Sequence, residues 1–324
     1  MDEFDFIKQI QQPNYKQPSL IKGIGDDAAV FRQNYQDIVT AVDTFVENIH
    51  FSDKTMNPFH IGYRAVAANI SDMAAMGCQP AYYMVSIVIP RHWDDDRLMQ
   101  VYEGMNQIAS EYAMDLIGGD TVSGNELVIS VTIIGFVEKG KARYRANAKN
   151  GDIVFATGTL GDAAAGLHVL MSGVRDEQQA HSYLKKRHQM PTPRVTFASE
   201  LGSVSRLVLN DVSDGIANES AEIAEASDVT ITLQYDAIPT HVDLLDFSLN
   251  QQRNWKLFGG EDFELIGTVP AKNWPYILTA SEKTGTPVTK IGQVSTNQKT
   301  NGSVFLEEDN HVSILHKAGY THLK

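Results

Sequence analysis

The sequence predicts an α+β protein of two domains, and three observations support this prediction. The chain has 324 residues, a length that is typical of two domains. Stretches with the alternating pattern of strands and stretches with helical periodicity mix without a strict strand–helix–strand repeat. Residues 139–150 are basic, polar and flanked by glycine, which is typical of a linker. We therefore expect an N-terminal domain over residues 1–148 and a C-terminal domain over residues 149–324.

The N-terminal half opens with a predicted short helix and a polar loop within residues 1–22. A helix is expected over residues 60–76, because the apolar stretch there ends at Gly77. A second helix is expected after Asp94, a good N-cap that apolar residues follow at helical spacing. The predicted strands are rich in β-branched residues, and they cover residues 38–43, 82–89 and 127–137.

The C-terminal half begins with a predicted strand over residues 152–157, followed by a glycine-bounded turn and an alanine-rich helix. Helical spacing and polar faces predict three more helices, over residues 176–190, 216–226 and 271–284. Short apolar stretches predict four more strands, over residues 207–211, 229–234, 263–269 and 288–294.

The composition argues against several classes of partner. The formal net charge is −13, whereas nucleic acids and anionic membranes select basic surfaces, so we expect neither as a partner. The apolar stretches fall short of the ~20 residues that a membrane span needs. The acidic N-terminus lacks the features of a secretory signal, and one cysteine, Cys78, excludes an internal disulfide framework. These features lead us to expect a cytoplasmic protein.

Acidic residues follow apolar stretches at widely separated points of the chain, beside Gly, Ser or Thr. If these points meet in the fold, several carboxylates crowd together, which is costly unless cations neutralise them. Mg²⁺ prefers oxygen ligands and usually keeps phosphate oxygens in its shell. The sequence therefore predicts a magnesium and phosphate site, with the alternative that each aspartate only caps a turn or a helix. The acidic residues include Asp27, Asp43, Asp72, Asp120, Asp211, Asp214 and Glu261.

Two glycine-containing stretches are further candidates for phosphate binding. Gly118-Gly119-Asp120-Thr121 combines backbone N–H groups with a carboxylate, although a plain glycine turn is the alternative. Gly158-Thr159-Leu160-Gly161-Asp162 precedes a helix whose N-terminus could hold an anion, or it is an ordinary turn. Arg143 or Arg145 in the linker could clamp a terminal phosphate. We reject near matches to the dinucleotide fingerprint and the P-loop, because the first would set carboxylates against pyrophosphate and the second lacks its Ser or Thr.

Six motifs are ordered along nearly the whole chain, at residues 23–29 (GIGDDAA), 46–51 (VENIHF), 71–77 (SDMAAMG), 118–121 (GGDT), 211–215 (DVSDG) and 259–265 (GGEDFEL). Together they resemble thiamine-monophosphate kinases. The resemblance implies an N-terminal mixed α/β sandwich that pairs across a homodimer, and a C-terminal α+β domain, as in aminoimidazole-ribonucleotide synthetases. It implies transfer of a phosphoryl group from ATP to thiamine monophosphate with several Mg²⁺ ions.

The resemblance also implies roles for individual residues. The implied metal ligands are Asp27, Asp43, Asp72, Asp120, Asp211 and Asp214. The implied ATP-binding residues are Tyr102, Gly119, Asp120, Arg145 and Ser213. The implied residues for thiamine monophosphate are His50, Glu261 and Tyr320. No general base is expected, because the acceptor phosphate is already anionic at neutral pH.

The chain departs from the family at Ala41 and Val42, where threonines are common, and at Tyr320, where many relatives have Trp. Any hydroxyl ligand at positions 41 and 42 is therefore missing, so that a backbone oxygen or water must replace it, or one metal site is weaker. Two alternatives remain open: a sister ATP-using enzyme, such as aminoimidazole-ribonucleotide synthetase or selenophosphate synthetase, and a non-catalytic sensor of nucleotides or thiamine phosphates. The N-terminal region lacks the reactive cysteine of selenophosphate synthetases, and the full acidic set argues against a sensor.

Overall fold

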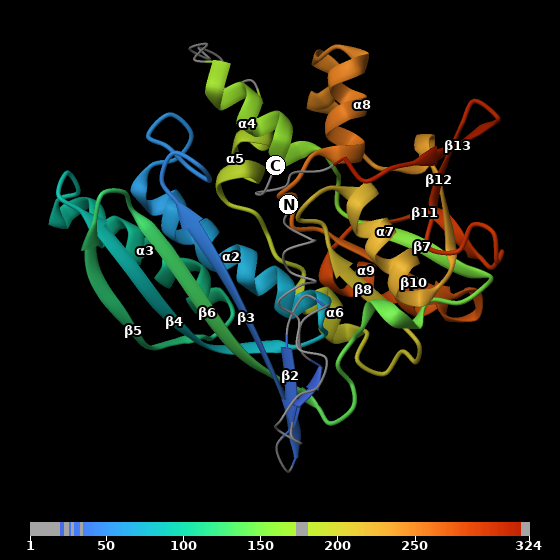
Figure 1. Cartoon of the computed structure of the whole chain (residues 1–324), viewed down its shortest axis with the longest axis horizontal. Helices are drawn as coiled ribbons and strands as arrows, with labels where there is room; N and C mark the ends of the chain where they lie inside the picture. Colours follow the sequence, from blue (N-terminus) through green and yellow to red (C-terminus); the bar gives the residue numbers. More distant parts are fainter. Residues whose placement is uncertain (1–19, 23–25, 27–28, 33–34, 173–180, 319–324) are drawn as a thin grey trace.

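The computed structural model describes residues 20–22, 26, 29–32, 35–172 and 181–318, whose strands form two sheets (Figure 1). Asp27 and Tyr320 lie outside the described residues. The N-terminal sheet has the order β1-β2-β3-β6-β4-β5, with β1 Leu20–Lys22, β2 Ala29–Arg32, β3 Gln36–Val46, β4 Gln79–Pro90, β5 Asp115–Gly124 and β6 Val128–Glu138. The C-terminal sheet has the order β13-β12-β9-β11-β7-β10-β8, with β7 Asp152–Thr157, β8 Val208–Asp211, β9 Thr230–Gln234, β10 Leu265–Pro270, β11 Val288–Ser295, β12 Val304–Glu308 and β13 His311–Leu315.

Two helices cover one face of the N-terminal sheet, and both were predicted. Helix α2 (Pro58–Ala75) begins after Asn57, whose side chain accepts a hydrogen bond from the backbone N–H of His60 at 2.9 Å. Helix α3 (Asp95–Glu111) begins after Asp94, which caps the N–H of Arg97 at 2.8 Å. No helix among the described residues covers the other face of the sheet (Figure 1).

The stretch Gly118-Gly119-Asp120-Thr121 is not a loop, which corrects the sequence-based expectation. It lies inside β5, an edge strand that runs parallel to β4. Glycine is required at position 119 because a Cβ there would lie 1.9 Å from the carbonyl oxygen of Val85 on β4. Glycine is depleted in strands, so this close approach between backbones gave no local signal for a strand.

In the described part of the C-terminal half, six α-helices accompany the sheet: α4 (Asp162–Ser172), α5 (Ser182–Gln189), α6 (Val195–Glu200), α7 (Ile216–Ser227), α8 (Leu249–Phe258) and α9 (Trp274–Thr284). The helices predicted at α4, α7 and α9 are confirmed, whereas α6, α8 and the β12–β13 hairpin were missed. Helix α8 did carry a sequence signal, because Ser248 and Gln251 form a capping box at its start.

One apolar core joins the two halves of the molecule. It includes Ala65 and Ile70 of α2 together with Phe155, Phe197 and Leu265 of the C-terminal half, all of them fully buried. This core crosses the expected boundary at residues 148 and 149, and the division of the chain into domains at that point stays a prediction. Among the described helices, none is long and apolar enough to cross a membrane.

Candidate active site

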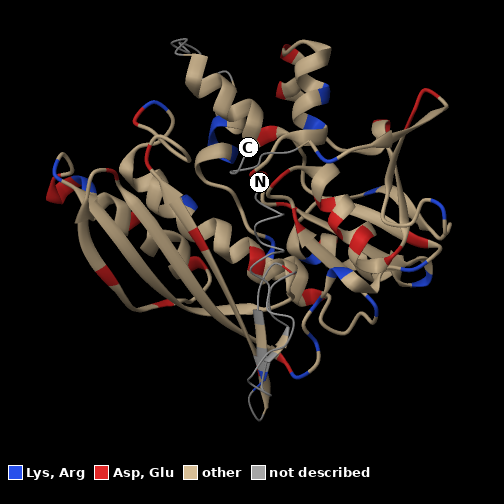
Figure 2. Ribbon diagram, viewed as in Figure 1, with Lys and Arg blue, Asp and Glu red and all other residues tan. Residues whose placement is uncertain are grey.

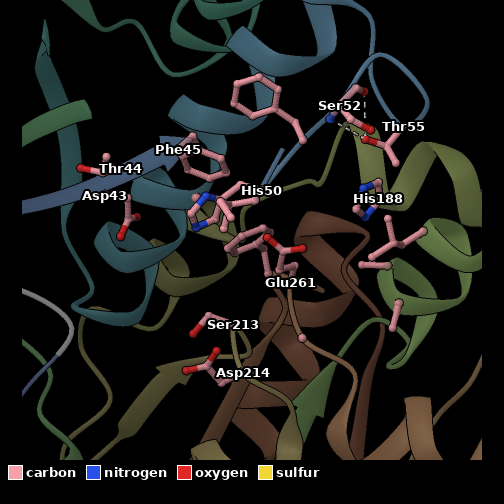
Figure 3. Close-up of a pocket in the computed structure, with 18 of the residues that line it drawn as sticks. Asp43, Thr44, Phe45, His50, Ser52, Thr55, His188, Ser213, Asp214 and Glu261 are labelled. Atoms are coloured by element: carbon pink, nitrogen blue, oxygen red, sulfur yellow. Dashed lines mark hydrogen bonds between the residues drawn. The ribbon is translucent and has the colours of Figure 1, made fainter. Parts of the chain in front are cut away.

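A cavity of about 600 Å³ lies between the two halves, and it collects seven of the predicted site residues. They come from β3 and the turn after it, from the last turn of α2, from the end of β8 and the loop that follows it, and from the loop that precedes β10. The seven are Asp43, His50, Asp72, Asp211, Ser213, Asp214 and Glu261. Figure 3 shows Asp43 and Asp214 toward one side of the cavity, His188 and Thr55 on the other, and His50 with Glu261 between them.

Three consecutive residues of β3, Asp43, Thr44 and Phe45, line the cavity. Ala41 and Phe45 are buried on the side covered by α2, and Asp43 lies between them in the same alternation, while Val42 and Thr44 belong to the opposite, exposed face. The sequence analysis placed Asp43 at the end of a strand, but β3 continues to Val46, so Asp43 lies within the strand. Burial raises the pKa of Asp43 to about 6. A neighbouring cation would reverse this effect by favouring the ionised carboxylate.

We expect Asp43→Asn to stabilise the metal-free protein at pH 8. Because the folded-state pKa of Asp43 is raised from 3.8 to about 6, its contribution to stability is present below pH 3.8 and lost as the pH rises through 6. The amide removes this penalty, which amounts to at most about 3 kcal/mol. Urea unfolding in a chelating buffer at pH 5 and pH 8 measures the effect. Equal stability of the two proteins at pH 8 would contradict the burial of a charged Asp43.

His50 is fixed by the tight turn that follows β3. Its Nδ1 accepts a hydrogen bond from the backbone N–H of Val46 at 3.0 Å, and its ring packs on Phe45 with centroids 5.4 Å apart. Since Nδ1 is an acceptor, the neutral ring carries its proton on Nε2. His50 is therefore oriented by the backbone before any ligand binds.

The loop that carries Glu261 is bound to the segment that carries Ser213 and Asp214. The N–H of Glu261 donates to the carbonyl of Ser213 at 2.6 Å, and a Cβ on Gly260 would lie 2.6 Å from that same oxygen. Glycine at 260 thus permits the close approach of the two segments. This contact explains why motifs that are about fifty residues apart form one wall of the cavity.

Two buried residues that the sequence analysis missed support the same wall. The carboxylate of Glu219, on α7, accepts hydrogen bonds from the N–H of Asp214 at 3.1 Å and from Nδ2 of Asn210 at 2.5 Å. The amide oxygen of Asn210 in turn accepts from Nε of Arg145 at 3.0 Å. Arg145 is therefore connected to the Asp214 loop, although it does not line the cavity. The sequence did offer a signal for Glu219, because it is an acidic residue in the first turn of the helix that follows the DVSDG motif.

Arg143 has a structural role, in contrast to Arg145. Its guanidinium is buried and donates to the carbonyls of Leu201 at 2.7 Å and Val204 at 2.8 Å, near the end of α6. Burial lowers the pKa of Arg143. The choice of Arg145 as the phosphate-binding candidate stays a prediction, but Arg143 is committed to these carbonyls.

The start of α4 holds a carboxyl group of the protein itself. The carboxylate of Asp262 accepts hydrogen bonds from the N–H groups of Gly161 at 2.6 Å and Ala163 at 2.9 Å. Burial, and then the nearby Asp162, raise the pKa of Asp262 to about 8. The expectation that this turn binds an external phosphate is therefore corrected, because Asp262 occupies the donors.

Tyr102, Gly119 and Asp120 do not line the cavity. Tyr102 lies on α3, and the other two lie on the edge strand β5. Asp120 is in register with Ser86 on β4, Ser86 with Ser130 on β6, and Ser130 with Thr44 on β3. Residues directly opposite in a sheet point to the same face, so Asp120 belongs to the uncovered face with Thr44.

The donor set on the acidic side of the cavity fits a hard divalent cation. Asp43, Asp72, Asp211 and Asp214 offer carboxylate oxygens, the ligands that Mg²⁺ takes together with waters and phosphate. Within the described part of the chain, no group of three or more His, Cys, Asp or Glu is close enough to hold a metal unaided. Bound phosphate would therefore have to supply part of the coordination.

Comparison with known proteins identifies the family of the chain. The family model of the N-terminal domain of AIR synthase related proteins matches residues 25–137, and that of the C-terminal domain matches residues 149–304. The chain is 45% identical to thiamine-monophosphate kinase of Bacillus subtilis, with all of both chains covered. It is 34% identical to that of Haemophilus influenzae, covering 100% of this chain and 98% of the relative. The chain belongs to the thiamine-monophosphate kinase family.

Solved structures agree with this membership. The structure of AaThiL complexed with AMPPCP and TMP has a TM-score of 0.86 at 26% identity, covering 99% of this chain and 97% of that one. Thiamine-monophosphate kinase from Stenotrophomonas maltophilia has a TM-score of 0.79 at 31% identity, covering 95% and 96%. The predictions of the family, of the two-domain α+β fold and of a kinase are thereby confirmed. Hydrogenase maturation protein HypE, at 20% identity and a TM-score of 0.72, shares the fold.

Proposed function

We propose that this protein transfers the γ-phosphoryl group of ATP to thiamine monophosphate, giving ADP and thiamine diphosphate. The observation that carries the proposal is one cavity with two chemically different sides. Carboxylates of both halves line one side, and Ala163, Ala164, Leu167 and Met171 of α4 line another part. Thiamine monophosphate has a matching division, with an anionic phosphate at one end and an aromatic, cationic body at the other. The relatives named above are kinases of this substrate.

The chain's own residues have separable tasks in this reaction. Asp43, Asp72, Asp211 and Asp214 would hold Mg²⁺, and these ions would neutralise the charges of both phosphate groups when bound. Ser213 lies in the same wall and can donate its hydroxyl to a phosphate oxygen. Glu261 offers a negative charge to the cationic ring, and His50 an oriented N–H. Because two anions must approach each other, positioning and charge neutralisation supply most of the rate enhancement.

A coupled assay of ADP release tests the proposed function. We expect turnover with ATP, Mg²⁺ and thiamine monophosphate, and only background ADP release with aminoimidazole ribonucleotide precursors or selenide. A sister ATP-using enzyme would reverse this preference. A non-catalytic sensor would bind thiamine monophosphate without releasing ADP.

We expect direct transfer, without a phosphorylated enzyme. The acceptor phosphate is already anionic at neutral pH, so it needs neither a general base nor a relay through a protein nucleophile. Brief incubation with γ-labelled ATP, acid quenching and separation of the protein measures any intermediate. Label that stays on the protein and is then chased into thiamine diphosphate would overturn direct transfer.

We further propose that two copies pair through the uncovered faces of their N-terminal sheets. This face carries exposed apolar side chains, with Val42 61% and Tyr82 38% accessible, and Tyr82 packs edge-on against Phe136 at 6.1 Å. A face of this kind on a sheet normally indicates an interface. Asp120 lies on the same face, so its proposed contact with ATP and metal would be made beside the partner copy.

Val42→Glu tests this pairing. A charge at the centre of an apolar interface is expected to convert a dimer into a monomer, with the helices of each chain intact. Sedimentation of the two proteins at about 10 μM measures the change. Val312→Glu is a matched control, because Val312 is also exposed on a strand but lies in the C-terminal sheet. A wild-type protein that sediments as a monomer would contradict the pairing.

A further inference from the structure

A fully buried arginine lies behind Glu261. Arg64 projects from α2 of the N-terminal half, and its side chain has no accessible surface. Its guanidinium forms an ion pair with Oε2 of Glu261 and donates hydrogen bonds to the backbone carbonyl and to Nδ1 of His188, the latter at 2.9 Å. Glu261 and His188 both line the cavity, whereas Arg64 does not. The arginine thus acts on the cavity from behind its wall.

His188 leaves the charge of Arg64 available to Glu261. Burial, and then the positive charge of Arg64, lower the pKa of His188 well below its usual value, so the ring is neutral. Because Arg64 can only donate, Nδ1 of His188 is the acceptor and the proton is on Nε2. The negative charge of the Glu261 carboxylate is then the charge that balances the positive charge of the Arg64 guanidinium.

Glu261 needs such a restraint because of its backbone conformation. Its φ is +67°, in the left-handed region that residues with a Cβ seldom adopt. Its N–H is held by the carbonyl of Ser213, and its side chain is 35% accessible toward the cavity. The backbone hydrogen bond does not fix the carboxylate, so the ion pair with Arg64 supplies the restraint on the side chain.

We propose that Arg64 is a positioning residue that holds the Glu261 carboxylate in the cavity and thereby sets the affinity for the phosphate acceptor. This proposal rests on the proposed function, in which Glu261 meets the cationic body of thiamine monophosphate. Arg64 comes from the N-terminal half and Glu261 from the C-terminal half. The acceptor site is therefore complete only when the two halves are packed together.

Arg64→Met tests the proposal, because methionine fills space without charge. We expect the KM for thiamine monophosphate to rise about tenfold or more, while kcat and the KM for ATP stay within about threefold. Arg64→Lys, which keeps the charge without the planar fork, should recover part of the affinity and serves if the methionine variant does not fold. An unchanged or lower KM for thiamine monophosphate in both variants would overturn the proposal.

A double-mutant cycle separates positioning from general destabilisation. If Arg64 acts through Glu261, then Arg64→Met adds little to the KM of Glu261→Gln, so the two increases do not multiply. Arg206→Met is the matched control, since it removes a two-point ion pair with buried Asp152, at 2.6 Å in both contacts, away from the cavity. It should lower thermal stability and leave both KM values unchanged. Increases that multiply fully in the cycle would mean that Arg64 has only a structural role.

A crystal structure of the Arg64→Met protein gives a readout that needs no substrate. We expect residues 259–263 to shift and the Glu261 carboxylate to leave its place in the cavity wall. Glu261 unmoved in that structure refutes the positioning role, even if the wild-type protein proves inactive on thiamine monophosphate. Inactivity of the wild type alone would refute the proposed function and not the positioning of Glu261.

Discussion

Asp72→Asn is expected to lower kcat at least ~100-fold while the protein stays folded. Asp72 lies in the last turn of α2 and lines the same cavity as Asp43 and Asp214. Asparagine keeps the size of the side chain but removes the charge that holds a divalent cation near the phosphates. Steady-state rates at saturating ATP, Mg²⁺ and thiamine monophosphate measure the loss, and the circular dichroism spectrum reports the fold.

Asp53→Asn is the control for this effect. Asp53 lies in the loop before α2, and its side chain is 73% accessible and bonded to Arg97 at 2.5 Å. It does not line the cavity, so its amide variant should keep the wild-type kcat. A kcat for Asp72→Asn within about threefold of the wild type would remove Asp72 from the proposed metal site.

The second large effect is on stability: Glu264→Ala is expected to destabilise the fold by about 3–5 kcal/mol. The Glu264 carboxylate is fully buried, bonded to Nη2 of Arg187 at 2.8 Å, to Nε and Nη2 of Arg194 at 2.6 and 2.5 Å, and to the hydroxyl of Thr157 at 2.6 Å. Alanine would leave two guanidinium groups without their carboxylate in an apolar setting. Removal of one partner from a buried ion pair costs far more than the net value of the pair.

The pH dependence of this effect follows from the pKa of Glu264. Burial alone would raise it, but the positive charges of Arg194 and Arg187 outweigh burial and lower it below 4.5. A lowered pKa contributes stability above pH 4.5, and this contribution is lost as the pH falls through the folded-state value. Urea unfolding at pH 7 and pH 3 should therefore show a smaller difference between wild type and variant at the lower pH.

Glu200→Ala is the control, because its ion pair with Lys283, at 2.9 Å, is exposed. Exposed pairs of this kind contribute about 0–1 kcal/mol. A loss no larger for Glu264→Ala than for Glu200→Ala would show that the buried network has little energetic importance.

Local sequence rules predicted the elements whose signals are local. The apolar stretch that ends at Gly77 indicated α2, and the cap at Asp94 with the helical spacing behind it indicated α3. The same rules failed at β5, because its glycines are accommodated by pairing with β4, and local sequence rules do not detect a contact between separate segments. They also ended β3 too early at Asp43, since a carboxylate inside a half-buried strand has no local explanation.

The candidate site shows the same division. The resemblance to the family predicted seven residues that line one cavity: Asp43, His50, Asp72, Asp211, Ser213, Asp214 and Glu261. No motif indicated Arg64 or His188, because their importance comes from contacts between residues more than a hundred positions apart. Likewise, only the structure reveals that the N–H groups at the start of α4 bind Asp262 and are unavailable to an external phosphate.

The convergence of carboxylates from both halves on bound phosphates can be tested by one diffraction experiment. Crystals would be soaked with Mn²⁺, a non-hydrolysable ATP analogue and thiamine monophosphate, and data would be collected at the manganese absorption edge. We expect anomalous peaks within about 2.5 Å of carboxylate oxygens from the N-terminal half (Asp43 or Asp72) and from the C-terminal half (Asp211 or Asp214). The same manganese ions should contact both phosphate groups. Phosphates bound elsewhere, or no manganese between these carboxylates, would contradict the proposed site.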